Sequence, residues 1–276
     1  MLAVTQLMMT ALVAASSAIG THHRSPEMPP VVTVHAKDFA YVAPKTVKSG
    51  ATTFRLVNDG KTMHHLSIIR LQKGKTVADF VNFMKKPAPP FGWFTEVGGP
   101  NPALPGGTVE ATLALEPGNY VMVCFIPSPG ESAPHMMKGM VSELTVTSDK
   151  GMAMPASDVT IKTSDYAFAM STPLTKGHHD IAVQNDAAQA HEVVVVQLAP
   201  GKTIADVNKW VDTDLMKGPP PGKPVGGMSG IAKGQAGSFS IDLAPGNYGL
   251  ICFVPDAKDG KAHSMHGMTK SFTVAN

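Results

Sequence analysis

The stretch that decides the fold is PGNYVMVCF, residues 117–125, which returns as PGNYGLICF at residues 245–253. In both copies a Pro-Gly-Asn turn leads into an apolar run that ends at a cysteine, Cys124 or Cys252. Turn residues followed by a short apolar run are typical of a β-strand. Each copy therefore predicts a strand that delivers a cysteine to the end of a sheet.

The repeat extends well beyond this stretch. Asn58-Asp59 matches Asn185-Asp186 at an offset of 127, and Val97-Gly98-Gly99 matches Val225-Gly226-Gly227 at an offset of 128. An internal repeat of this length indicates that a whole domain was duplicated. The segments that we expect are a signal peptide (1–20), an N-terminal tail (21–30), a first domain (31–147), a linker (148–157) and a second domain (158–276).

The composition favours compact β structure. Charged residues make up only 16% of the chain, 26 Gly and 23 Pro punctuate it, and short runs rich in Val and Thr recur between turn signals. We predict an all-β protein of two tandem Greek-key β-sandwiches. The predicted strands cover residues 31–35, 53–58, 65–71, 109–115 and 120–125 in the first copy, and 159–163, 180–185, 192–198, 238–243 and 248–253 in the second.

One short helix is expected in each copy. Thr76 and Thr203 each stand three residues before an aspartate, Asp79 or Asp206, and apolar residues follow at helical spacing. A threonine that caps the helix and an acidic residue at its third position form a variant of the capping box.

The first 20 residues carry no charge, run apolar from Leu7 to Ala15 and finish with the small residues Ala18 and Gly20. This pattern is typical of an export signal, so we expect a periplasmic or extracellular protein with no membrane contact beyond the signal segment. The formal net charge of +2 is too small to indicate a nucleic-acid partner.

Both cysteines open the same pattern of chemistry-bearing residues. Ten residues separate each cysteine from a histidine and four separate that histidine from a methionine, while a further histidine lies 60 or 61 residues upstream of the cysteine. Thiolate, imidazole and thioether together are a soft-metal ligand set that suits both Cu(I) and Cu(II). The predicted copper ligands are His64, Cys124, His135 and Met140 in the first copy, and His191, Cys252, His263 and Met268 in the second.

Several alternatives remain open. Met137 and Met265 also repeat and could replace the predicted methionines as ligands. A disulfide between the two cysteines would require their Cα atoms to lie within about 7 Å of each other. Among the other histidines, His35, His65 and His266 are expected to be solvated or to support the sites from outside, and His178 and His179 are expected to lie in a turn at the surface.

With these residues in view, both copies resemble the cupredoxins, the blue-copper fold of plastocyanin and azurin. The resemblance covers nearly all of residues 31–147 and 158–276 and rests on the upstream histidine after an Asn-containing turn and on the Cys, His and Met of one loop. It implies one mononuclear copper site in each domain. The ten residues between cysteine and histidine depart from the family, where two to four are usual.

The sequence predicts that the protein is not an enzyme, because no histidine flanks either cysteine and no His-x-His pair occurs that would hold further coppers. Three hypotheses remain. The protein could carry electrons, with a redox partner protein, or sequester and deliver copper, as its 17 methionines would favour. It could also be a metal-free cupredoxin-like binding module.

Overall fold

The structure is a computed structural model that describes residues 28–88, 91–149 and 151–276. The expected all-β fold is confirmed. The elements of the first half are β1 (Val31–Lys37), β2 (Ala40–Val42), β3 (Thr46–Lys48), β4 (Gly50–Asn58), β5 (Ser67–Leu71), α1 (Val77–Lys85), β6 (Phe94–Gly98), β7 (Thr108–Leu115), β8 (Gly118–Val123), the 3-10 helix η1 (His135–Lys138) and β9 (Val141–Thr147).

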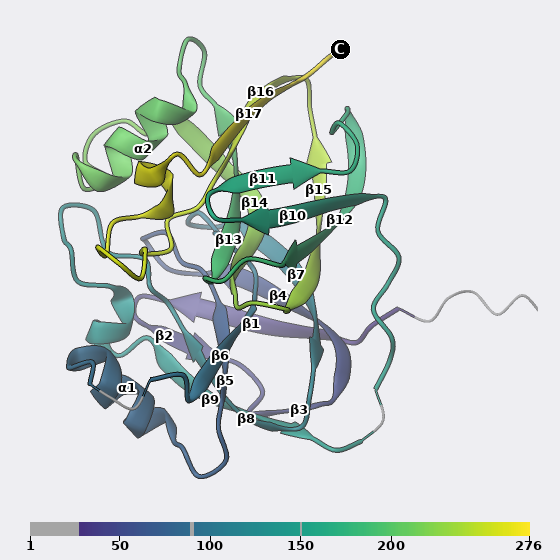
Figure 1. The fold of residues 1–276 in the computed structure, drawn as a ribbon, viewed down its shortest axis with the longest axis vertical. Coiled ribbons are helices and arrows are strands. Elements are labelled where there is room, and N and C mark those ends of the chain that lie inside the picture. The colour runs from purple at the N-terminus through teal and green to yellow at the C-terminus, as the bar shows by residue number, and fades with distance from the viewer. Residues whose placement is uncertain (1–27, 89–90, 150) are drawn as a thin grey trace, which may run out of the picture.

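The second half repeats this order. Its elements are β10 (Val159–Ser164), β11 (Ala167–Met170), β12 (Gly177–Asn185), β13 (His191–Leu198), α2 (Ile204–Asp212), β14 (Gly222–Ile231), β15 (Ala236–Leu243), β16 (Gly246–Ile251), the 3-10 helix η2 (His263–His266) and β17 (Thr269–Val274). Both α-helices lie on the same side of the molecule, at the left of Figure 1.

Two sheets run through both halves. One has the strand order β11-β10-β12-β15-β7-β4-β1-β2, and the other has the order β17-β16-β13-β14-β6-β5-β8-β9-β3. Apart from β3, each order is symmetric about its centre: a strand of one half and its counterpart from the other half lie equally far from the middle of the sheet. The chain crosses between the sheets within each half, as a Greek-key sandwich requires.

The halves meet along their edge strands. β15 pairs with β7 through Gly237 and Leu113, and β14 pairs with β6 through Ile231 and Val97. One cluster of buried apolar side chains draws residues from both halves. The two tandem sandwiches are therefore joined at their edges: edge strands left unpaired would expose hydrogen-bonding groups, and the duplication satisfies these groups against each other.

The predicted capping boxes are present in both helices. Thr76 accepts a hydrogen bond from the Asp79 N–H, and the Asp79 carboxylate accepts one from the Thr76 N–H; Thr203 and Asp206 repeat the arrangement. Phe80 of α1 packs into a small apolar cluster beneath the helix. In the described part of the chain, no helix is long and apolar enough to cross a bilayer.

The predicted linker, residues 148–157, contains a single bridge between Met152 and Ala51 and no strand among its described residues. The domain boundaries drawn from the sequence stay a prediction. The predicted signal peptide and most of the N-terminal tail lie outside the described residues.

The carboxyl group of Glu96 at the junction predicts a pH-dependent stability. Burial raises the pKa of Glu96 from 4.5 to about 7. The buried carboxyl is neutral below pH 4.5, where the stability of the fold is highest, and this stability is lost as the pH rises through 7 and the group must ionise. We expect Glu96→Gln to raise the free energy of unfolding at pH 8 by roughly 1 kcal/mol, a value reduced for partial exposure, and to change it little at pH 4.5.

Thermal unfolding at both pH values measures this effect. Glu143→Gln serves as a control of opposite sign, because the Lys45 ammonium lowers the pKa of Glu143. A gain for Glu96→Gln that is equal at both pH values would contradict the assignment.

Candidate metal centres

Three donor atoms meet at the end of the sandwich in the first half. His64 lies between β4 and β5, Cys124 directly follows β8, and His135 begins η1. The Nδ1 atoms of the two histidines are 3.0 Å apart, and the Cys124 Sγ is 3.6 Å from the Nδ1 of His135. All three residues are fully buried. We call these residues, with Met140, site one.

The second half builds the same arrangement from His191, Cys252 and His263. The Nδ1 atoms of its histidines are 3.0 Å apart, and the Cys252 Sγ is 3.5 Å from the Nδ1 of His263. These residues, with Met268, are site two. In each site the three donor atoms lie within 4.8 Å of one another, so that one metal ion could contact all three. Both cysteines are free and buried, and neither forms a disulfide.

An asparagine fixes the loop that carries the upstream histidine. The Asn58 side chain accepts a hydrogen bond from the Gly60 N–H and donates to the carbonyls of Thr62 and Ala103. Asn185 makes the matching set of bonds in the second half. Asparagine side chains that bond the backbone two residues on form a tight turn without regular structure, which here holds the following histidine at the sheet end.

A carboxylate orients each upstream histidine. The Nε2 of His64 lies 3.0 Å from an Asp38 oxygen, and the Nε2 of His191 lies 2.7 Å from an Asp165 oxygen. In each imidazole the Nε2 atom that bonds the carboxylate carries the proton. The Nδ1 atom therefore keeps a free lone pair, which could bind a metal ion beside the cysteine. Burial lowers the pKa of the His64 and His191 imidazoles. It also lowers the pKa of His135, to about 4, and in all three residues burial favours the neutral form.

The cysteines are held by backbone N–H groups. Burial raises the pKa of the Cys124 thiol to about 12, and hydrogen bonds from the His65 and Ile126 N–H groups partly offset this rise. Burial likewise raises the pKa of Cys252, whose Sγ accepts a hydrogen bond from the Glu192 N–H at 3.4 Å. Binding of a metal ion would therefore displace a proton from each thiol.

The methionines differ sharply in exposure. Met140 and Met268 are fully buried, whereas the alternatives Met137 and Met265 are 38% and 55% exposed. The Cys124 N–H donates to the carbonyl of Met140 at 3.3 Å, which ties this methionine to the cysteine, and the second half repeats the bond. Burial beside the cysteine favours Met140 and Met268 as the thioether donors.

The long loop between cysteine and histidine is closed on itself. In the first half a bridge joins Pro127 to Pro134, and the His135 N–H donates to the Ile126 carbonyl at 2.9 Å. In the second half the bridge joins Pro255 to Ala262. The additional residues thus protrude as a small hairpin, and the histidine still returns to the cysteine.

The donor set fits copper. In site two, the His263 Nε2 faces the Gln189 Oε1 at 3.4 Å and the His191 Nε2 faces a carboxylate, so both Nδ1 lone pairs point at each other across 3.0 Å. Two lone pairs at this distance repel unless a proton or a metal ion lies between them. A thiolate, two neutral imidazoles and a thioether are the ligands of trigonal copper sites.

The remaining histidines have varied roles. His35 bonds Asp59 at the surface, and His266 is partly exposed and stacks on Tyr166. His178 is exposed as expected, but the expectation of a turn is wrong for both histidines, because they lie in β12. His179 is also only 8% exposed and bonds Asp158 at 2.7 Å. A strand places successive side chains on opposite faces, so one histidine of the pair points inward.

Sequence reasoning missed Asp38 and Asp165, which orient the upstream histidines, and Asn101, which lies between the halves. The two aspartates stand 127 residues apart, which is the offset of the repeat. The repeat register therefore contained the signal that could have found them, whereas Asn101 has Ser229 as its counterpart and gave no such signal.

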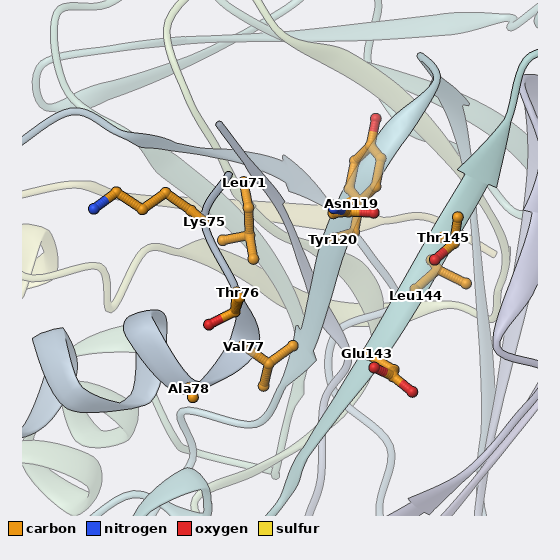
Figure 2. Close-up of a pocket in the computed structure, with 10 residues that line it drawn as sticks. All are labelled: Leu71, Lys75, Thr76, Val77, Ala78, Asn119, Tyr120, Glu143, Leu144 and Thr145. Atoms are coloured by element: carbon orange, nitrogen blue, oxygen red, sulfur yellow. The ribbon is translucent and has the colours of Figure 1, made fainter. Parts of the chain in front are cut away.

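One cavity lies away from both sites, between the start of α1 and the strands β8 and β9 (Figure 2). Its volume is about 330 Å³. Lys75, Thr76 and Val77 line one side of it, and Tyr120 and Glu143 lie opposite. A smaller cavity occupies the matching place beside α2. Because a cavity recurs at the start of both helices, we regard these cavities as a consequence of the repeated fold.

The decisive observation is that both sandwiches end in the same Cys, His and Met loop facing an upstream histidine. Both halves have a cupredoxin-like fold. Searches for a matching protein family and for a similar curated protein found none.

Solved structures similar to this cupredoxin-like chain include a reduced auracyanin from Roseiflexus castenholzii, at 24% identity over 44% of this chain and 99% of its own, with a TM-score of 0.29. Two others are from Nitrosomonas europaea. A blue copper oxidase is 14% identical over 90% of this chain and 86% of its own, with a TM-score of 0.26. A copper nitrite reductase is 15% identical over 90% of this chain and 95% of its own, with a TM-score of 0.27. At these TM-scores the similarities assign no function.

The prediction that the protein is not an enzyme is contradicted by these comparisons. Two of the structures that match 90% of this chain are an oxidase and a nitrite reductase, which are enzymes. The prediction relied on ligands that stand next to each other in the sequence. It is corrected because catalytic groups can also come from separate elements of a fold.

Proposed function

We propose that the protein binds one copper ion in each half and uses the two sites for electron transfer. The proposed ligands are His64, Cys124, His135 and Met140 in site one, and His191, Cys252, His263 and Met268 in site two. The observation that carries the proposal is the convergence of one Sγ and two Nδ1 atoms within 4.8 Å, found twice.

Copper in such a ligand set cycles between its two oxidation states with little change of geometry. The other residues of each site hold the proposed ligands in place and keep water away from them. The Asp38 and Asp165 carboxylates hold the upstream imidazoles in one tautomer, the backbone N–H groups hold each sulfur, and full burial of the donors excludes water from both sites. We further propose an exported protein and an external redox partner, which the apolar segment at residues 1–20 and the paired sites support.

The test is a titration of the purified protein with Cu(II), followed by visible absorption and electron paramagnetic resonance. We expect an intense thiolate-to-copper band that saturates at two copper ions per chain and bleaches reversibly on reduction. Copper retained without colour would favour sequestration of Cu(I) over electron transfer. No retained copper would leave a metal-free binding module.

The outer edges of the sites differ in charge. The Nε2 of His135 lies 3.1 Å from the Ser128 hydroxyl, whereas the Nε2 of His263 lies 3.8 Å from a carboxylate oxygen of Asp256. Ser128 and Asp256 occupy the same position of the repeat. A hydrogen bond from the Tyr166 hydroxyl holds the pKa of Asp256 well below its usual range, and the side chain is only 1% exposed.

A buried negative charge stabilises the more positive, oxidised state of a nearby metal. We therefore expect site two to have a lower reduction potential than site one, by on the order of 50 mV, about one tenfold change for a one-electron couple. Spectroelectrochemical titration of Cys124→Ser, which retains site two, and of Cys252→Ser, which retains site one, measures both potentials.

The repeat supplies matched variants for this prediction. Asp256→Ser should raise the potential of site two, and Ser128→Asp should lower that of site one. Equal potentials in the two sites, or a fall in potential for Asp256→Ser, would show that the carboxylate does not set the difference.

A further inference from the structure

Three polar side chains are buried where the two halves meet. His65 is 5% exposed, Asn101 is 2% exposed and Glu192 is 7% exposed. His65 directly follows a proposed ligand of site one, and Glu192 directly follows one of site two. Buried polar groups destabilise a fold unless each has a hydrogen-bond partner. The hydrogen-bond partners of these three side chains therefore show which parts of the two halves they connect.

The three side chains form one continuous chain of hydrogen bonds. The His65 Nδ1 lies 3.1 Å from the Asn101 Oδ1, and the Asn101 Nδ2 donates to the Glu192 Oε2 at 2.8 Å. At one end, the Phe125 N–H donates to the His65 Nε2 at 2.8 Å. At the other end, the Phe253 N–H donates to the Glu192 Oε1 at 2.8 Å.

The directions of these bonds are mutually consistent. Because a backbone N–H can only donate, the His65 Nε2 accepts and its proton is on Nδ1. That proton is donated to the Asn101 oxygen, which turns the amide nitrogen toward Glu192. The tautomer and the amide orientation are thus assigned by the network, and every donor of the chain meets an acceptor.

The ends of this chain are equivalent in the repeat. Phe125 follows Cys124 and Phe253 follows Cys252. The hydrogen bonds therefore run from the peptide next to one cysteine, through three side chains, to the peptide next to the other cysteine. His65 and Glu192 occupy the same position of the repeat, so the chain of hydrogen bonds joins equivalent points of the two sites across the junction.

We propose that His65, Asn101 and Glu192 form a bridge through which electrons pass between the two metal sites. This inference rests on the proposed function. The step is a one-electron exchange in which one electron leaves the reduced site and enters the oxidised one. No covalent bond forms or breaks, and each proton of the bridge stays on its atom. Electrons tunnel more readily along covalent and hydrogen-bonded contacts than across van der Waals gaps, and the bridge supplies such contacts across the junction.

The metal-free protein offers the first test. In nuclear magnetic resonance spectra, the His65 Nδ1 proton should be visible and protected from exchange with water. In Asn101→Leu the bridge lacks its central link and this signal should disappear. The matched control is Ser229→Ala, since Ser229 is the repeat counterpart of Asn101, is fully buried at the same junction and donates its hydroxyl to the Leu66 carbonyl, outside the bridge.

The second test measures the exchange itself. A substoichiometric pulse of reductant is applied to the fully copper-loaded, oxidised protein, and the thiolate-to-copper bands are followed with time. Wild type and Ser229→Ala should show a phase whose rate does not depend on protein concentration and which is absent from Cys124→Ser and Cys252→Ser. Asn101→Leu and Glu192→Gln should slow this phase by about tenfold, equivalent to about 1.4 kcal/mol in the barrier, because each variant removes one hydrogen-bonded link between the sites.

The outcomes separate the two proposals. If the single-site variants bind no copper or show no reversible reduction, the proposed function fails. If both sites are redox-active and Asn101→Leu exchanges electrons at the wild-type rate while its His65 signal is lost, the function stands and the bridge is overturned. Unchanged thermal unfolding of Glu192→Gln excludes misfolding as the cause of a slower rate.

Discussion

Replacing either cysteine by serine should remove half of the thiolate-to-copper absorption, and replacing both should remove all of it. The band arises from charge transfer between sulfur and copper, and a hydroxyl oxygen cannot supply it. Cys124 and Cys252 are in separate sites, so each single variant should keep one copper with an intact band. Visible absorption of copper-loaded Cys124→Ser, Cys252→Ser and the double variant measures this.

The methionines provide the control for this experiment. Met140→Leu should shift the band or weaken copper binding in site one, whereas Met137→Leu should leave both unchanged, because Met137 is 38% exposed and Met140 is fully buried. If one cysteine variant alone abolished the whole band, the two sites would not be independent and the proposal of one copper in each half would be wrong.

A methyl group at Gly99 should unfold the junction between the halves. A Cβ at this residue would lie 1.9 Å from the carbonyl oxygen of Leu66, and its φ of +145° is rarely adopted by other residues. The Gly99 carbonyl also accepts the Ser229 N–H at 2.8 Å across the junction. Relief of the overlap would move both strands, so we expect Gly99→Ala to destabilise the fold by about 3 kcal/mol or more.

Gly106 provides the matched control. Its φ of +73° also favours glycine, but a Cβ there would meet no atom within 4 Å. Gly106→Ala should therefore cost only about 1 kcal/mol, the usual penalty of a left-handed residue. Denaturant unfolding of both variants compares them directly. Equal losses would show that backbone conformation, and not contact with Leu66, makes Gly99 necessary.

The sequence predicted those parts of the fold whose signal is local. The run that ends at Cys124 contains its own turn and its own apolar strand, and the threonine caps carry their aspartates three residues later. The short strands β2 and β3 escaped because they are largely exposed and pair only at an edge. β14 contains four glycines and a proline, a composition typical of a loop, and only pairing with β13 and β6 makes it a strand.

The sites were predictable to the extent that the repeat marked them. The convergence of His64, Cys124 and His135 follows from conserved spacing between two copies of one chain. The joining of the halves does not, because pairing of β7 with β15 depends on two edges that are far apart in the sequence. For the same reason Asn101 could not be connected to Glu192, which lies 91 residues away.

The central claim is that the chain holds one copper ion in each half. Its most direct test is a crystal structure of the copper-loaded protein with anomalous scattering recorded at the copper absorption edge. The account predicts two anomalous peaks, each within bonding distance of one cysteine Sγ and two histidine Nδ1 atoms, at Cys124 and at Cys252. Copper bound elsewhere, or a single peak shared between the halves, would contradict it.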